Sequence, residues 1–182
     1  KAPKMNLHVS TEGQEKALES LIQGRIDLAL DPGPARKASV HIKTIMQGKF
    51  ICLIRKDHPV VKMGQKFDVD EFLSYPHILI DSKGARKGLF DRMLAKQNLE
   101  RRVAVSASNF AMVPRLLRNS NMIGVFTQRV CDVLKEDFDL VTLPIPIEMD
   151  LLDGKMAWLV RYDNDPKHKW FRQEIEQIAA TL

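Results

Sequence analysis

Apolar and polar positions alternate at the start of the chain and then change to a helical spacing. Leu7 and Val9 alternate with polar neighbours, which predicts a half-buried strand that begins almost at the first residue. Thr11 and Gln14 have the spacing of a capping box, and the apolar residues that follow fall on one face of a helix. A second apolar strand is predicted over residues 25–30. If the two strands pair in parallel, the unit is a right-handed strand–helix–strand crossover.

The rest of the chain largely repeats this succession of strands and helices. Two strands at 39–45 and 49–55 are expected to form a pair that a turn at 56–59 closes. Further strands are predicted at 77–81, 102–106, 122–126, 140–147 and 155–162. Further helices are predicted at 68–74, 88–97, 110–118 and 127–134, and a last one after Asp165. The alternation predicts an α/β fold with mostly parallel sheets.

Individual residues refine this prediction. Asp68 and Thr127 stand where helix N-caps are expected, and the Asp165-Pro166 pair is a strong start signal for the closing helix. Two prolines within 140–147 indicate an edge strand. The expected apolar face of the closing helix consists of Trp170, Phe171, Ile175 and Ile178.

The net charge of +5 raises the question of nucleic-acid binding, but the distribution of the basic residues argues against it. The basic clusters lie far apart, and none is interleaved with aromatic residues as a single-strand binding groove would be.

No apolar window approaches the roughly 18 residues that a membrane span needs. Cys52 and Cys131 are expected to be reduced thiols of a cytoplasmic protein, and a redox-sensing pair is the less favoured alternative.

The sequence does not display the motifs of common enzyme classes. The five histidines have no paired metal-ligand spacing, and no nucleophile elbow, P-loop or dinucleotide-binding glycine motif occurs. We therefore predict a protein that is not an enzyme and that needs neither a cofactor nor a metal.

Four segments in a fixed order resemble a known family. They read LESLIQGRIDLAL at 18–30, CLIRKDHPV at 52–60, MIGVFTQRV at 122–130 and DPKHKWFRQEI at 165–175. Together they resemble the effector-binding domain of LysR-type transcriptional regulators, nearest the branch of nodulation and aromatic-degradation regulators. Two features depart from the family: its first strand and helix precede the segment that starts this chain, and Thr127 replaces a usual proline.

The resemblance implies a periplasmic-binding-protein-like fold of type 2, with two Rossmann-like lobes and an effector cleft between them. Residues 1–57 and 155–182 would form the first lobe, and residues 58–154 the second. A small-molecule effector, aromatic or carboxylate-bearing, would bind in the cleft. The fragment would form a homodimer and the intact protein a tetramer, and DNA would be bound only through an N-terminal winged helix-turn-helix domain outside this chain.

Ligands of α/β folds bind where strands end, so the polar residues after the predicted strands are candidates. Ser108, Asn109 and Phe110 follow the strand at 102–106 and offer a hydroxyl, an amide and an aromatic ring. Effectors of similar regulators contact this turn, and the alternative is that these residues only cap a helix.

The remaining candidates lie at other strand ends. Thr11 and Gln14 could hold an anion at a helix start, or they could form a capping box without a ligand role. Ser82 follows the strand at 77–81 and is expected near the same crevice. The neighbouring basic residues could attract an acidic effector, although an exposed basic loop is the favoured interpretation.

One rival interpretation belongs to a different functional class. A solute-binding protein of a transporter has the same fold but is exported. An upstream winged helix-turn-helix in the full gene product would support the regulator, and a signal peptide would support the transporter protein. An enzyme on a related two-lobe fold is the least favoured hypothesis, because no catalytic constellation is visible.

Overall fold

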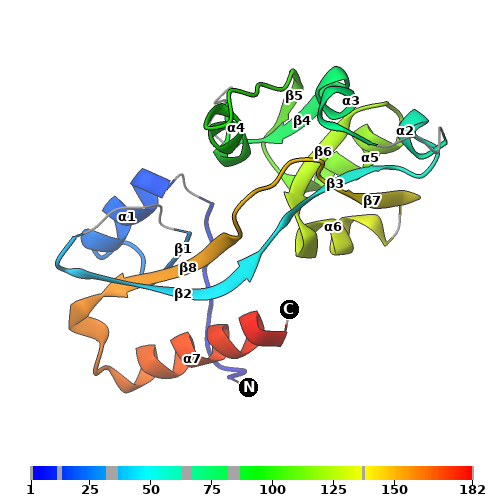
Figure 1. Cartoon of the computed structure of the whole chain (residues 1–182). Helices are drawn as coiled ribbons and strands as arrows, with labels where there is room; N and C mark the ends of the chain where they lie inside the picture. The colour runs from blue at the N-terminus through cyan, green and yellow to red at the C-terminus, as the bar shows by residue number, and fades with distance from the viewer. Residues whose placement is uncertain are drawn as a thin grey trace.

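The computed structural model describes residues 2–11, 14–31, 37–62, 67–81, 87–136 and 138–181, and in these ranges the strands form two sheets (Figure 1). The three-stranded sheet has the order β1 (Ala29–Leu30), β8 (Leu152–Leu159), β2 (Val40–Gly48). The five-stranded sheet has the order β5 (Val103–Ala107), β4 (His77–Ile80), β6 (Ile123–Thr127), β3 (Phe50–Arg55), β7 (Leu140–Pro144).

Helices cover both sheets. On the three-stranded sheet, α1 (Gln14–Ile22) lies on one side and α7 (Pro166–Thr181) on the other (Figure 1). The five-stranded sheet is accompanied by α2 (Pro59–Lys62), α3 (Val69–Ser74), α4 (Leu89–Ala95), α5 (Val113–Arg118) and α6 (Gln128–Lys135). Two short 3₁₀ helices, η1 (Phe110–Met112) and η2 (Val160–Tyr162), follow β5 and β8. No helix in the described ranges is long and apolar enough to cross a membrane.

β3 explains why the five-stranded sheet has a core on each face. Successive side chains of a strand point to opposite faces. Ile51 and Leu53 pack with α5 and α6, and Cys52 and Ile54 pack with α3 and α4. The continuous apolar run of this segment is therefore that of a strand buried on both faces.

The structure separates two strands that were predicted to pair with each other. β2 pairs with β8, whereas β3 pairs with β6 and β7, and only Lys49 lies between β2 and β3. The chain thus crosses from one sheet to the other at Lys49 and returns between β7 and β8 (Figure 1). The structure places β3 in the five-stranded sheet, whereas the sequence prediction assigned residues 50–57 to the first lobe.

The predicted strand at the beginning of the chain is not formed. Residues 5–10 have no strand geometry, and Leu7 and Val9 are 62% and 78% exposed. The second predicted strand is reduced to Ala29–Leu30, which pairs antiparallel with β8. A strand needs a second strand to pair with, and in the part of the chain that the structure describes no strand pairs with residues 5–10. The predicted parallel crossover is therefore absent there.

The prediction of mostly parallel sheets is also wrong for the described strands. Only the pairs β4–β5 and β4–β6 are parallel, and the three-stranded sheet is antiparallel throughout. The reason is that β3 and β8 enter their sheets from the crossing between them, and so run against their neighbours. The prolines of 140–147 do mark an edge, because β7 ends the five-stranded sheet.

Of the helix caps predicted at Asp68, Asp165 and Thr127, the structure confirms the first two. The capping box predicted for Thr11 and Gln14 lies partly outside the described residues. The carboxylate of Asp68 accepts a hydrogen bond from Glu71 N, and Asp165 Oδ1 accepts one from His168 N at 2.8 Å. Thr127 occupies the N-cap position of α6, but its side chain makes no capping hydrogen bond.

The predicted apolar face of the closing helix overlaps only in part with the face that α7 buries: Phe171 and Ile175 are half-buried. Its most buried residues are His168, Arg172 and Ala179, while Ile178 is 58% exposed. Arg172 lies over the Trp158 ring with its Cζ atom 4.6 Å from the centroid. A guanidinium with several acceptors and an aromatic face can be buried as well as an aliphatic side chain, and apolar periodicity does not detect it.

Candidate functional site

Three strand ends meet at the edge of the five-stranded sheet where the chain crosses over. Ile80, at the end of β4, pairs with Ala107 at the end of β5, and Asp81 N donates to Ala107 O at 2.9 Å. Thr127, at the end of β6, pairs with Phe50, the first residue of β3. The residues that follow β4 and β5 therefore lie on the side of the sheet from which the crossing segment leaves, as ligand-binding residues of α/β folds do.

Ser108, Asn109 and Phe110 lie together on this edge and are exposed. Asn109 Oδ1 accepts a hydrogen bond from Ala111 N at 3.1 Å, so Asn109 does cap η1 as the alternative interpretation predicted. This bond uses the amide oxygen and leaves the amide nitrogen as a donor. In the described ranges, neither that nitrogen nor the Ser108 hydroxyl has a hydrogen-bond partner.

An aromatic surface adjoins these donors. The Phe110 ring is 41% exposed and packs edge-to-face on buried Phe126, with 5.4 Å between ring centroids. Phe126 belongs to β6, so the ring of Phe110 covers the sheet edge rather than extending freely into solvent. A hydroxyl, an amide N–H group and a fixed ring side can bind a small molecule with an apolar body and an anionic or polar group.

The other candidates are not brought into contact with this turn by any described interaction. Thr11 is exposed at the end of the segment 2–11 and makes no hydrogen bond within the described part of the chain. Gln14 is the first residue of α1, and its side chain lies outside the described residues, as does all of Ser82. In Figure 1 the start of α1 is on the side of its sheet that faces α4 and β5.

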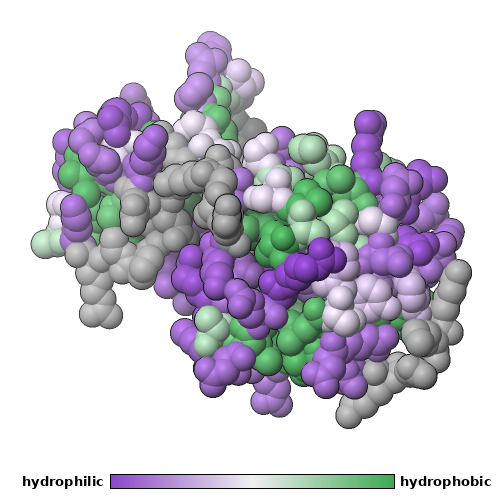
Figure 2. Space-filling model, turned by 90° about the horizontal axis from the view of Figure 1, so that it is seen from above, coloured by the Kyte–Doolittle hydropathy of each residue, from purple (hydrophilic) through white to green (hydrophobic). Residues whose placement is uncertain are grey.

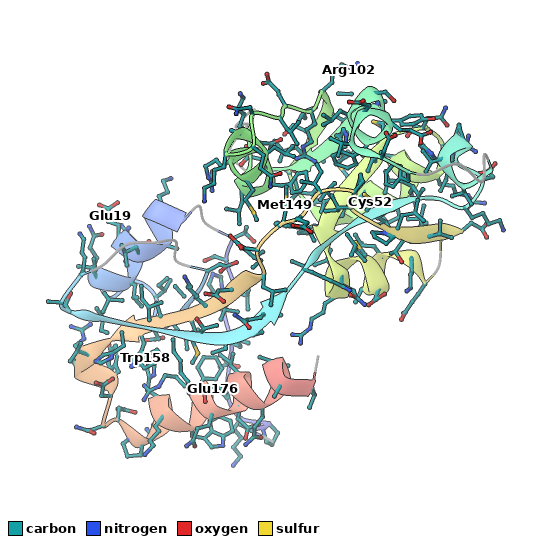
Figure 3. The ribbon with its side chains drawn as sticks, in the orientation of Figure 1. Glu19, Cys52, Arg102, Met149, Trp158 and Glu176 are labelled. Atoms are coloured by element: carbon teal, nitrogen blue, oxygen red, sulfur yellow. The ribbon has the colours of Figure 1, made fainter. Side chains whose placement is uncertain are left out.

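Two residues that the sequence interpretation did not consider, Lys49 and Gln128, lie at the same edge. Lys49 O accepts a hydrogen bond from Gln128 N at 3.0 Å, which joins the crossing segment to the start of α6. A groove of about 360 Å³ opens beside them. It is lined by Lys49, Phe50, Ile51, Gln128, Thr142, Leu143, Pro144, Ile145, Ile147 and Met149. Met149, labelled in Figure 3, lies at this crossing. No local sequence pattern marks Lys49 or Gln128 as a site residue, because only the pairing of distant strands brings the two together.

A buried ion pair fixes the helix that follows the loop after β4. Arg101 Nε donates to Asp91 Oδ1 at 2.7 Å, and Gly88 N donates to Asp91 Oδ2 at 2.6 Å. Burial raises the pKa of Asp91, but the hydrogen bonds and charge of Arg101 outweigh it and hold that pKa below its usual value. The carboxylate thereby ties the start of α4 to the segment before β5, at the opposite end of β5 from Ser108.

The RKDHP segment at 55–59 has a structural role at the opposite end of β3. His58 is fully buried, and its Nε2 lies 3.1 Å from Asn121 O while its Nδ1 accepts from Val60 N. This pattern requires a neutral ring, and burial lowers the pKa of His58. Arg55 donates twice to Asn121 Oδ1, so the segment fastens the turn after β3 to the segment before β6.

The described residues contain no group of three side chains that could hold a metal ion. In the view from above, hydrophobic residues form small areas between hydrophilic ones (Figure 2).

Comparison with protein families decides the assignment. The LysR substrate binding domain family matches residues 1–180. The chain belongs to this family. The predicted resemblance to LysR-type regulators is thereby confirmed.

Relatives of this LysR substrate-binding domain are transcriptional regulators. The transcriptional activator NahR of Pseudomonas putida is 26% identical over 172 residues, which cover 94% of this chain and 57% of the relative. The regulator LinR of Sphingobium indicum is 25% identical, covering 98% of this chain and 59% of the relative. Nodulation protein D 2 of Rhizobium tropici is 22% identical, covering 90% and 52%. The chain thus spans between half and three fifths of the length of these relatives.

Solved structures confirm the expected α/β, periplasmic-binding-protein-like fold of type 2. The regulatory domain of MexT, a transcriptional activator of Pseudomonas aeruginosa, superposes with a TM-score of 0.76 at 26% identity, covering 87% of this chain and 76% of that one. The effector binding domain of a BenM variant gives a TM-score of 0.76 at 14% identity, covering 99% and 83%. The effector binding domain of QuiR in complex with shikimate gives 0.70 at 14% identity, covering 92% and 78%.

Proposed function

We propose that this LysR substrate-binding domain senses a small molecule at the sheet edge that carries Ser108, Asn109 and Phe110. The observation that carries the proposal is the position of these residues: they are exposed at the end of β5, on the edge from which the chain crosses to the other sheet. The regulators among the relatives support this role, and QuiR is described as a complex with shikimate, a small molecule that carries a carboxylate. On this proposal the chain is a sensor without catalytic function.

We infer an effector with an apolar or aromatic body and a carboxylate. The Phe110 ring supplies the apolar surface, and the Asn109 amide nitrogen and the Ser108 hydroxyl supply donors. Lys49 adds a positive charge at the same edge, and in the described ranges it forms no ion pair. Thr11 and Gln14 remain proposed contacts from the facing lobe, and Ser82 remains a proposed contact from the segment after β4.

We further propose that the lobes follow the sheets, with the effector between them. The first lobe would then comprise the chain up to Lys49 and from β8 onward, and the second lobe the residues between. The effector must bind one lobe arrangement better than another, since equal affinity shifts no equilibrium. The remaining proposals are a homodimer of this domain, a tetramer of the cytoplasmic intact regulator, and DNA binding by a winged helix-turn-helix domain outside this chain.

A thermal-shift screen tests the proposed function. Aromatic acids, flavonoids, amino acids and dicarboxylates are added to this chain, because any ligand that binds only the folded state raises its melting temperature. We expect a hit among the aromatic or carboxylate-bearing compounds. The proposal fails if no class shifts the melting temperature of either this chain or a longer regulatory domain.

Asn109→Asp is the most informative variant for locating the site. Aspartate keeps an oxygen that accepts from Ala111 N, so η1 stays capped, but it removes the amide donor and adds a negative charge. We expect the hit to lose its effect on this variant while the melting temperature without ligand changes little. Asn119→Asp is the matched control, since Asn119 lies at the far end of α5 and only donates to Arg115 O. Equal loss in both variants would contradict the proposed location.

A further inference from the structure

Arg129 connects the helix after β6 to the opposite sheet. It is the second residue of α6, on the five-stranded side of the molecule. Its Nη1 atom donates to Ala179 O at 3.2 Å, and the same nitrogen lies 3.7 Å from Met46 Sδ. Ala179 belongs to α7 and Met46 to β2, both on the three-stranded side. One side chain therefore contacts two elements across the crossing.

The acceptor of Arg129 is a helix-terminal carbonyl. The last four carbonyl groups of an α-helix have no partner within the helix, and Ala179 is two residues from the end of α7. A cation at this end is favourable because the carbonyl dipoles give it a partial negative charge. Figure 1 shows the end of α7 approaching the side of the molecule that carries α6.

The surroundings hold Arg129 and its partners in place. Gln128 N donates to Lys49 O, which fastens the first turn of α6 to the crossing segment. The Met46 side chain lies against Gly154 of β8, where a Cβ atom would collide with Met46 Cγ. The pairing of β2 with β8 is irregular just before Met46, so this part of the ribbon departs from a regular ladder at the contact.

We propose that Arg129 is a positioning residue that stabilises the observed arrangement of the two lobes by capping α7 from α6. The inference rests on the proposed function insofar as the lobe arrangement transmits effector binding. The crossing segments join the lobes covalently, and the Arg129–Ala179 hydrogen bond is an additional contact that the observed arrangement makes. A hydrogen bond from a charged donor is strong enough to shift a two-state equilibrium by about tenfold.

The distance between the lobes tests the proposal without any effector. Nitroxide labels at Lys96→Cys, just after α4, and Lys167→Cys, in α7, place one spin on each lobe at exposed positions. Both native cysteines are fully buried, so labelling under native conditions is confined to the introduced thiols. Double electron–electron resonance then measures the distance distribution in this background and in Arg129→Ala, Arg129→Lys and Arg115→Ala.

We expect Arg129→Ala to broaden the distribution and shift its maximum. Arg129→Lys, which keeps a cationic donor for Ala179 O, should restore much of the original distribution. Arg115→Ala, which removes an exposed arginine from α5, should leave it unchanged. A loss of stability alone would lower the urea concentration at the unfolding midpoint without changing the distance between the two labels. Unfolding curves are therefore recorded on the same samples.

The proposal is overturned if Arg129→Ala keeps the distance distribution of the parent and of Arg115→Ala. If Arg129→Ala does not fold, Arg129→Gln takes its place and the same criterion applies. Because no ligand is present, this failure would leave the effector-binding proposal intact. Conversely, a failed ligand screen would leave the distance result standing.

Discussion

Asp91 and Arg101 form an ion pair that is almost completely removed from water: Arg101 Nε lies 2.7 Å from Asp91 Oδ1, and the two side chains are 2% and 8% exposed for arginine and aspartate respectively. The guanidinium also lies over the Phe90 ring, with Cζ 4.9 Å from its centroid. Charged groups at such depth are tolerated only when their partners are present, because removal of one partner leaves an uncompensated buried charge.

Removing one member of the pair should be strongly destabilising. Arg101→Met leaves the Asp91 carboxylate buried with only backbone donors, so we expect the free energy of unfolding to fall by about 3–5 kcal/mol. Equilibrium urea denaturation measures this loss. The double variant Asp91→Asn with Arg101→Met should recover part of the stability, because no buried charge remains, and equal stability of the single and double variants would contradict this account.

Buried histidines should make the domain less stable as the pH falls from 6.5 toward 4. Burial, with the nearby charge of Arg101, lowers the pKa of His77 to about 4 from its ordinary value of 6.5. Between these values the unfolded chain binds a proton that the folded chain does not, so stability is complete above pH 6.5 and decreases as the pH falls. The shift corresponds to a loss of about 3 kcal/mol by pH 4. The lowered pKa of Asp91 acts in a separate window, below its ordinary value of 3.8.

Urea denaturation at several pH values tests this dependence. His77→Gln removes the titrating group, so the slope of stability against pH between 6.5 and 4 should decrease relative to the parent. The exposed His8→Gln is the matched control and should leave the slope unchanged. If His77→Gln leaves the slope as it is, other groups control the acid sensitivity; His58, whose pKa burial also lowers, would be the next to test.

Arg172 should be required for the docking of α7 on its sheet. Its Nη1 donates to Tyr162 O at 3.0 Å and to His168 Nδ1 at 2.8 Å, and its Nη2 donates to Asp163 O at 3.2 Å. Arg172→Met keeps an apolar stem but leaves the buried His168 Nδ1 and two part-buried carbonyl groups without this donor. Each neutral group that stays unsatisfied costs about 1–3 kcal/mol. We expect faster proteolytic cleavage within α7 and a lower urea midpoint. Exposed Arg118→Met should show neither effect.

Gly154 should tolerate a side chain only if Met46 is shortened. A Cβ atom at residue 154 would overlap Met46 Cγ, and forcing an extra methyl group into a packed site costs about 1–3 kcal/mol. Gly154→Ala should therefore be destabilising, and Met46→Ala in the same chain should offset part of the loss. A double-mutant cycle measures the coupling energy between the two positions. If the two changes in the free energy of unfolding simply add, the contact between Met46 and residue 154 is not the cause of the loss.

The two cysteine thiols should be unreactive in the folded domain. Cys52 and Cys131 are fully buried, and burial raises the pKa of both, that of Cys131 to about 12. A thiol reagent that requires the thiolate should react with neither cysteine natively and with both in urea. Rapid reaction of either thiol in the folded domain would support the redox-sensing alternative. It would also mean that the introduced cysteines could not be spin-labelled selectively.

Local signals in the sequence were sufficient for much of this domain. Asp68 predicted the start of α3 because a cap and its helix are neighbours in the chain, and the strands at β4, β5 and β6 follow from short apolar runs. The turn of Ser108, Asn109 and Phe110 was predicted as a candidate site for the same reason: it directly follows a predicted strand. The sequence also determined the family, since each of the four segments that carry the resemblance is a continuous stretch of the chain.

The tertiary structure decided every feature that depends on a distant partner. β3 belongs to the five-stranded sheet because Val125 and Leu143 supply its hydrogen bonds, and these residues lie far along the chain. Conversely, residues 5–10 have the alternation of a strand but not its geometry, because alternation describes one face of a strand and a ladder also needs a neighbour. The contacts of Lys49 with Gln128 and of Arg129 with Ala179 also depend on distant partners. In both, the acceptor is a backbone carbonyl group, which every residue has, so no sequence pattern predicts which donor will bind it.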